Sequence, residues 1–162
     1  MKRPARRAQH GVSSNAVRVG RPNGGAPVSF SNNEWAMLRS VRPNILIIGA
    51  DEALASTVSA LVAELPGPVA YLGPNDAPPV QHEVEMLVLP DVAVLSTDRQ
   101  HEWMTWMSDL DGRRPQIVAT SRVPVYPLVQ TQIFLETLYY RLNTILLEMQ
   151  VGDSPYRRYF EL

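Results

Sequence analysis

Short apolar runs alternate with segments of helical periodicity from residue 43 onward. Ile45 to Ile48 is a continuous apolar run closed by Gly49, which is typical of a strand buried on both faces. Similar runs predict strands over 69–72, 86–89, 116–120 and 144–149. Apolar positions at helical spacing predict helices over 31–40, 51–65 and 134–142, with another after Thr97. Strands separated by helices predict a three-layer α/β fold with a mostly parallel sheet.

The helix after Thr97 carries two further signals. Thr97 followed by Gln100 has the form of a capping box, in which the two side chains close the start of a helix. Trp103, Trp106 and Met107 then lie on one stripe, which we interpret as a core-facing surface. The Pro-rich stretch 124–127 is expected to form a structured loop.

Composition narrows the class of protein. The chain has 162 residues, 45% of them hydrophobic and 19% charged, as expected for one soluble globular domain. No apolar run approaches the roughly 18 to 20 residues that a membrane span needs, and the basic start lacks the apolar segment of a signal peptide. The absence of cysteine excludes disulfides, thiolate zinc sites and thiol catalysis. These features predict a cytoplasmic protein of bacterial type, without a metal site.

Charge is distributed unevenly along the chain. Residues 1–42 carry eight Lys or Arg against the single acid Glu34, which gives a net charge of about +7. Residues 43–162 carry seven Arg against fifteen acids, which gives a net charge of about −8. We therefore expect a basic, largely disordered arm over 1–42 with a short helix near 31–40, an α/β domain over 43–150 and a tail over 151–162. Two interpretations of the arm remain open. It either folds back on the acidic domain or makes weak nonspecific contacts to DNA through Lys2, Arg3, Arg6 and Arg7.

One late segment resembles a known family. Residues 134–143 read Phe-Leu-Glu-Thr-Leu-Tyr-Tyr-Arg-Leu-Asn, similar to the Phe-Arg-x-Asp-Leu-Tyr-Tyr-Arg-Leu-Asn signature of the AAA+ ATPase domain of sigma-54-dependent transcription activators. Residues 116–122 resemble the sensor strand of that family, residues 87–95 its Walker B segment, and residues 49–56 fall at its phosphate-binding loop. The resemblance covers about residues 44–149. It implies a P-loop NTPase-like sheet with strand order 5-1-4-3-2, and ATP and magnesium as the ligands of the family.

The residues that would bind the phosphates are largely replaced. A phosphate-binding loop needs glycines, a Lys for the terminal phosphates and a hydroxyl for magnesium. Gly49 and the hydroxyl of Ser56 are retained, but Ala55 stands where the Lys is expected. Asp51 and Glu52 would place negative charge where a triphosphate would lie.

The other motifs are also degenerate. Pro90 stands at the position of the magnesium-binding Walker B carboxylate, and only the following acid, Asp91, is kept. Ser121 replaces the sensor Asn. Of the family's two arginines that reach a neighbouring subunit's ATP, the first matches Leu135, while the second is kept as Arg141. Since Arg141 could instead pair with an acid of its own domain, its role stays open.

Three functional hypotheses follow. The first is a degenerate AAA+ domain without catalytic residues, lid subdomain, sigma-54-contacting loop or bound cofactor, which acts as a protein-binding regulatory module in transcription or signalling. The second is an ATP-binding transcription regulator of the sigma-54 activator family. The third is a receiver-like signalling domain with Asp91 near the phosphorylated position, which predicts the strand order 2-1-3-4-5.

Overall fold

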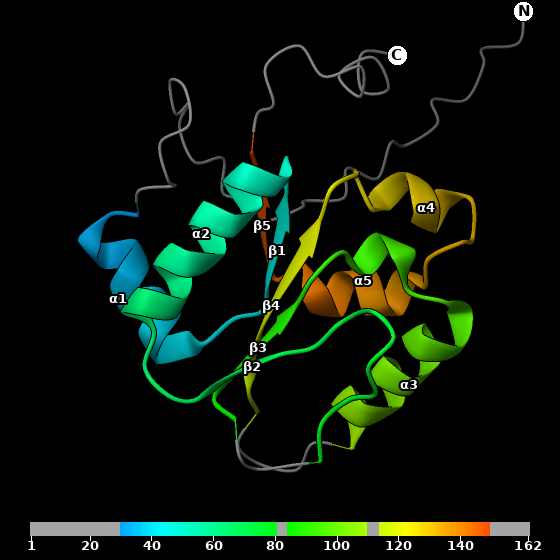
Figure 1. Ribbon diagram of the computed structural model, residues 1–162, viewed down its shortest axis with the longest axis horizontal. Coiled ribbons are helices and arrows are strands. Elements are labelled where there is room, and N and C mark those ends of the chain that lie inside the picture. The colour runs from blue at the N-terminus through cyan, green and yellow to red at the C-terminus, as the bar shows by residue number, and fades with distance from the viewer. Residues whose placement is uncertain (1–29, 81–83, 110–113, 150–162) are drawn as a thin grey trace, which may run out of the picture.

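The computed structural model describes residues 30–80, 84–109 and 114–149. The expected basic residues Lys2, Arg3, Arg6 and Arg7 and the tail over 151–162 lie outside these ranges. The described chain alternates strands and helices (Figure 1), in the order α1 (Asn32–Val41), β1 (Ile45–Ile48), α2 (Asp51–Glu64), β2 (Val69–Tyr71), β3 (Met86–Leu89), the 3-10 turn η1 (Val92–Val94), α3 (Thr97–Ser108), β4 (Gln116–Ser121), α4 (Tyr126–Gln130), α5 (Glu136–Leu142) and β5 (Ile145–Glu148).

The five strands form one parallel sheet. Its order is β2-β3-β4-β1-β5, which confirms the order 5-1-4-3-2 that the family resemblance implies. Because β4 is inserted between β3 and β1, with Ile45 opposite both Val118 and Ile145, the order differs from that of a receiver domain. The receiver hypothesis is therefore wrong.

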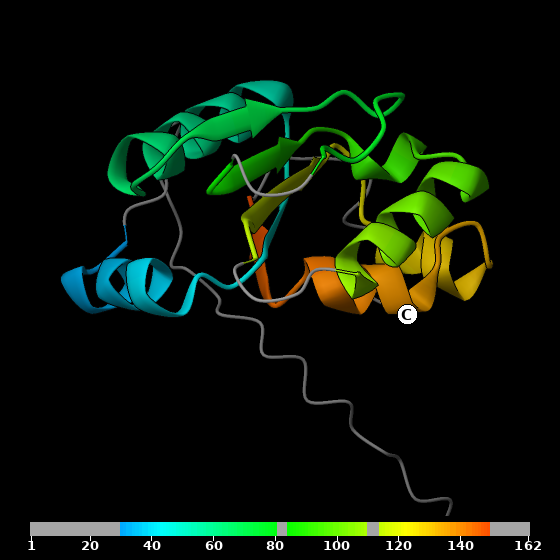
Figure 2. The same cartoon turned by 90° about the horizontal axis from the view of Figure 1, so that it is seen from below.

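Helices cover both faces of the sheet and give three layers (Figure 2). Helices α1 and α2 lie on one face, and α3, α4 and α5 lie on the other. Side chains of β1 alternate between the two cores, because successive residues of a strand point to opposite faces. Ile45 and Ile47 pack toward α1 and α2, while Leu46 joins the core that Trp103 and Met107 of α3 fill. The core-facing stripe expected on α3 is thus confirmed.

Helix α1 is capped at its start and anchored to the domain by Leu38 and Arg42. Ser31 and Glu34 form a capping box at its start, and the hydrogen bond from the Ser31 backbone N–H lowers the pKa of Glu34. Leu38 is buried against the α1–α2 core, although the sequence placed this helix in the arm before the domain. At the end of the helix, Arg42 adopts a left-handed conformation and forms an ion pair with Glu85.

Two local predictions on this face of the sheet need correction. Ser96, not Thr97, caps α3 by accepting a hydrogen bond from the N–H of Arg99. Gln100 is fully buried and takes no part in capping. The Pro-rich stretch 124–127, expected as a loop, runs into α4, a five-residue helix with Pro127 in its first turn. Proline is tolerated there because the backbone N–H has no helical partner.

The Gln100 side chain instead joins three backbone segments. Its amide nitrogen donates to the carbonyl oxygens of Leu95, at 2.9 Å, and Ile133, at 3.1 Å. Its amide oxygen accepts from the N–H of Leu135 at 2.7 Å. Gln100 therefore holds η1 and the segment before α5 against α3, in the interior where water cannot replace these bonds.

Candidate functional site at the carboxyl edge of the sheet

Three strand ends meet where the family resemblance places a nucleotide. In parallel α/β sheets, ligands bind outside the carboxyl ends of the strands, where neighbouring connections diverge. Here β1 ends before Gly49, β3 before Pro90 and Asp91, and β4 at Ser121. The arrowheads of β1 and β4 point to the same edge (Figure 1).

The connection from β1 to α2 is only two residues long. β1 ends at Ile48 and α2 begins at Asp51, so Gly49 and Ala50 alone join them. The segment expected to form a phosphate-binding loop over 49–56 is therefore helical from residue 51. Ala55 is exposed on the second turn of α2, and the Ser56 hydroxyl donates to the carbonyl oxygen of Ala53 at 3.1 Å.

Gly49 has a packing role in this short connection. A Cβ atom added to Gly49 would lie 2.7 Å from the Cβ of Met149, which is closer than real Cβ atoms approach. Strand β5 brings Met149 to this position, where its N–H donates to the carbonyl oxygen of Ile48 at 2.7 Å. The close approach of two chain segments accounts for a glycine here without any phosphate.

We expect Gly49→Ala to lower the free energy of unfolding by about 1–3 kcal/mol, because the new methyl group overpacks the contact with Met149. Urea unfolding of both proteins measures the difference. Met149→Gly removes the opposing Cβ. In that background, Gly49→Ala should therefore lower the free energy of unfolding by less than it does in the parent protein. Equal stability of Gly49→Ala and the parent protein would show that the contact does not constrain residue 49.

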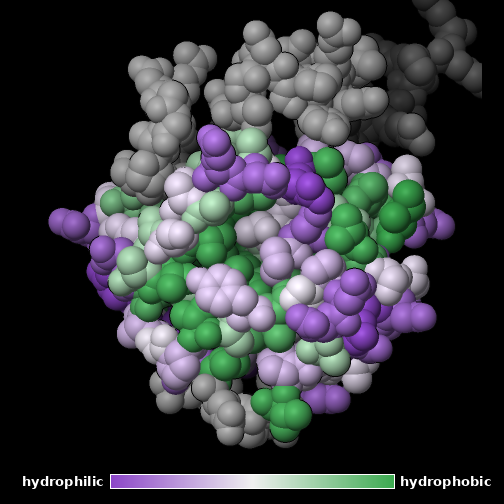
Figure 3. Space-filling model, in the orientation of Figure 1, coloured by the Kyte–Doolittle hydropathy of each residue, from purple (hydrophilic) through white to green (hydrophobic). Residues whose placement is uncertain are grey.

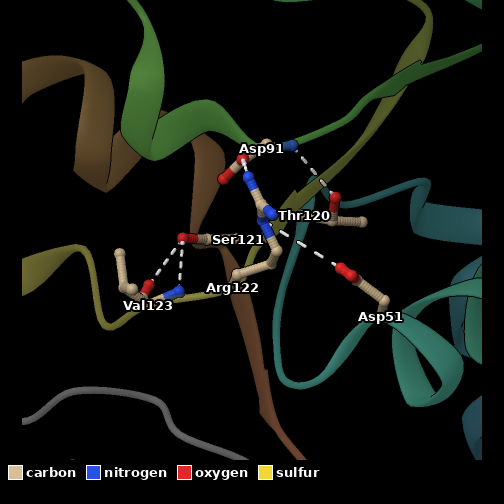
Figure 4. A network of polar contacts seen from close by, with 6 residues as sticks. All are labelled: Asp51, Asp91, Thr120, Ser121, Arg122 and Val123. Atoms are coloured by element: carbon tan, nitrogen blue, oxygen red, sulfur yellow. Dashed lines mark hydrogen bonds and ion pairs between the residues drawn. The ribbon is translucent and has the colours of Figure 1, made fainter.

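Arg122 occupies the space between the strand ends (Figure 4). It follows β4 directly, and its guanidinium donates to one oxygen of Asp91 from Nε at 3.1 Å and from an Nη atom at 2.5 Å. The same Nε lies 4.0 Å from a carboxylate oxygen of Asp51 at the start of α2. The hydrogen bond to Asp91 raises the pKa of Arg122. One cation thus links the acids that follow β1 and β3.

Asp91, Thr120 and Ser121 form further hydrogen bonds at this edge. Asp91 has a left-handed backbone, with φ of 51°, which Asp tolerates better than most residues, and its N–H donates to the Thr120 hydroxyl at 3.2 Å. Ser121, expected at the sensor position, is fully buried. Its hydroxyl donates to the carbonyl oxygen of Val123 at 2.5 Å and accepts from the N–H of Val123 at 3.2 Å. Ser121 is turned away from the space beside Arg122 (Figure 4).

Arg141 lies at the opposite edge of the sheet, since it comes just before β5. Its carbonyl oxygen accepts a hydrogen bond from the side-chain amide of Asn44, at 2.8 Å. Its side chain is exposed, and no acid among the residues described pairs with it. The structure thus separates Arg141 from Gly49, Asp91 and Ser121.

The hexapeptide that carries the resemblance has a clear structural role. Leu138, Tyr139 and Leu142 are buried against the core on the α3 side, and burial raises the pKa of Tyr139. Tyr140 and Arg141 remain exposed. Packing explains Leu138, Tyr139 and Leu142, while the exposed Tyr140 and Arg141 are free to contact other molecules.

Arg122 is a site residue that the sequence motifs do not single out. Its position in the sequence could have indicated this role. An arginine directly after a central strand lies at the same sheet edge as the residues that follow the neighbouring strands. Both neighbouring strands are followed by an acid, Asp51 and Asp91, which favours an ion pair at this edge.

Two kinds of site are absent from the residues described. Across the ranges 30–80, 84–109 and 114–149, no three His, Asp or Glu side chains gather in a way that could hold a metal ion. No helix in these ranges has the length and apolar character needed to cross a membrane. The carboxyl edge is a polar cluster that the fold assembles from separate strands (Figure 4).

Comparisons with known proteins identify the fold. No family model and no curated protein matches the chain. Among solved structures it is similar to NtrX from Brucella abortus in complex with ATP, at 14% identity and a TM-score of 0.60, over 74% of this chain and 34% of that one. It is also similar to AMPPCP-bound DnaA from Aquifex aeolicus, at 18% identity and a TM-score of 0.51, over 77% of this chain and 45% of that one.

These similarities, together with the strand order, show an AAA+ type of P-loop NTPase fold. The resemblance to the AAA+ domain of sigma-54-dependent activators is confirmed at this level. The chain spans between about a third and just under half of the two proteins it matches. At these identities the likeness concerns the fold alone.

Proposed function

We propose that this chain is a non-catalytic AAA+-like module that binds a protein partner in transcriptional or signalling control and does not use ATP. The observation that supports the proposal most directly is the two-residue connection between β1 and α2. A phosphate-binding loop needs several residues whose N–H groups converge on the phosphates. Gly49 and Ala50 are too few to form such a loop.

The charges at the carboxyl edge support the same proposal. Asp51 and Glu52 lie in the first turn of α2, where they interact favourably with the helix dipole. A triphosphate in this place would meet both carboxylates and also Asp91. Arg122, the cation beside them in the described part of the chain, is already bonded to Asp91. Like charges at short range therefore oppose nucleotide binding.

An exposed apolar surface provides a place for a protein partner. Val94, Tyr126 and Ile133 are 57%, 40% and 58% exposed, in η1, in α4 and just after α4. Gln100 binds the carbonyl oxygens of both Leu95 and Ile133, which brings η1 close to the segment after α4. Hydrophobic side chains are gathered at the surface over α4 in Figure 3. Exposed apolar patches of this kind mark protein contacts.

Capture of partners from the native host tests this proposal. We expect Ile133→Asp to reduce recovery of a specific partner by about tenfold or more, since a carboxylate in an apolar contact is costly to desolvate. Val41→Asp is the matched control, because Val41 is 67% exposed at the end of α1, on the other face of the sheet. Equal recovery by both variants, or no specific partner with the parent chain, would contradict the proposed surface.

One alternative function rests on the comparisons. The similar NtrX and DnaA structures contain ATP and AMPPCP, which favours an ATP-binding regulator of the sigma-54 activator type. That function predicts assembly that depends on ATP. Light scattering that gives the same mass with and without Mg-ATP would count against it.

A further inference from the structure

A pocket of about 480 Å³ opens at the amino edge of the sheet, opposite the carboxyl edge described above. Its walls come from the residues that precede three adjacent strands. Arg42 and Asn44 precede β1, Arg114 precedes β4, and Arg141 and Thr144 precede β5. The starts of the neighbouring strands β4, β1 and β5 therefore border a basic opening.

The framework of this pocket is held by three side-chain hydrogen bonds. Asn44 donates to the carbonyl oxygen of Arg141 at 2.8 Å and accepts from the N–H of Ile117 at 3.0 Å. Gln116 is buried, and its side chain donates to the carbonyl oxygen of Pro43 at 2.7 Å. These bonds join the starts of β1 and β4 to the end of α5, so the arginines project from a fixed base.

The charge in the pocket is unbalanced. Arg42 is neutralised by its ion pair with Glu85, and it also donates to the Glu85 carbonyl oxygen at 2.7 Å. Arg114 and Arg141 are exposed, and no ion pair joins either of them to an acid in the described parts of the chain. Among the described residues that line the pocket there is no acid, so Arg114 and Arg141 contribute two positive charges, close in magnitude to the charge of −1.5 to −2 that a phosphate monoester carries at pH 7.

An apolar wall accompanies these charges. Tyr140, which is 46% exposed, offers the accessible part of this wall, and the buried Met107 and Ile117 also line the pocket. Ligand sites commonly combine such a wall with a few polar groups that fix orientation. Arginine suits this role because its planar fork binds phosphate oxygens through two parallel hydrogen bonds.

We propose that this pocket binds a small phosphate monoester with an apolar or aromatic group, with Arg114 and Arg141 holding the phosphate and Tyr140, Met107 and Ile117 contacting the apolar part. The site is formed by one chain and needs no second copy. It is independent of the proposed protein-binding surface, which lies at η1 and α4, so either proposal can fail without the other.

Calorimetric titration of the full chain tests the site, with phenyl phosphate, inorganic phosphate and benzoate as probes. We expect phenyl phosphate to bind most tightly, inorganic phosphate more weakly because it lacks the apolar contact, and benzoate most weakly because it carries a single charge. Arg114→Gln and Arg141→Gln should each weaken phenyl phosphate binding about tenfold, since each removes charged hydrogen bonds. Replacing either arginine by lysine keeps the positive charge but removes the planar guanidinium. The lysine variants should therefore bind phenyl phosphate more weakly than the parent chain but more tightly than the glutamine variants.

Arg39→Gln is the matched control, because Arg39 is an exposed arginine of α1 that does not line the pocket. Amide chemical shifts should change at Asn44, Arg114 and Thr144 when phenyl phosphate is added. Three results would overturn the proposal: no phenyl phosphate binding at millimolar concentration, equal weakening by Arg39→Gln, or shift changes spread over the surface. Tighter binding of an acidic peptide or of DNA than of phenyl phosphate would also overturn it and assign the pocket to a macromolecule.

Discussion

Replacing Gln100 by Leu is expected to lower the free energy of unfolding by at least about 3 kcal/mol. The substitution keeps the side-chain volume roughly constant but removes the hydrogen bonds to Leu95, Ile133 and Leu135. Each buried backbone group left without a partner costs about 1–3 kcal/mol. Since small domains have a total stability of about 5–15 kcal/mol, this loss is a large share of the whole.

Urea or thermal unfolding of Gln100→Leu measures this loss, which corresponds to a melting temperature lower by roughly 10–20 °C. Gln130→Leu is the matched control, because Gln130 is an exposed residue at the end of α4. The control should stay within about 0.5 kcal/mol of the parent chain. A loss below 1 kcal/mol in Gln100→Leu would show that Gln100 does not hold η1 and the α5 entry in place.

Sequence patterns predicted the strands and main helices well because buried positions are apolar and recur with the period of each element. The run Ile45 to Ile48 is apolar throughout since it lies between two strands and under helices on both faces. The strand order could not be obtained from such runs. It came from the family resemblance, whose hexapeptide includes the buried Leu138, Tyr139 and Leu142.

The residues missed by sequence patterns act through contacts distant in the chain. Gln100 fits a local capping pattern, but its partners Ile133 and Leu135 lie more than thirty residues away. Arg122 meets Asp91 and Asp51 only after three strands are placed side by side. Contacts between residues so far apart in the chain leave no pattern of spacing in the sequence. The roles of Gln100 and Arg122 can therefore be recognised only in the folded structure.

The expected phosphate-binding loop shows how two patterns can compete. Residues 49–56 align with the loop in order, yet residues 51–65 also have helical periodicity and contain good helix formers. The helix prevails, because α2 starts at Asp51 and directly packs Leu54 into the core. Ala55 and Ser56 are therefore positions on a helix.

The second large effect concerns nucleotide binding. We expect Mg-ATP to bind with a Kd above about 1 mM, since the residues described at the carboxyl edge offer neither a converging set of N–H groups nor an unpaired cation. Arg122→Ala should not improve binding, because it leaves Asp51, Glu52 and Asp91 without a compensating charge. Tight binding by this variant would show that the Arg122 ion pair alone closes the site.

Calorimetric titration of the full chain with Mg-ATP tests the central claim most directly, namely that an AAA+-type fold is kept here without its nucleotide site. NtrX from Brucella abortus, whose structure contains ATP, serves as the positive control. The account predicts heats no larger than those of dilution up to millimolar Mg-ATP, with binding to NtrX under the same conditions. Saturable binding to this chain at low-micromolar concentration would contradict it.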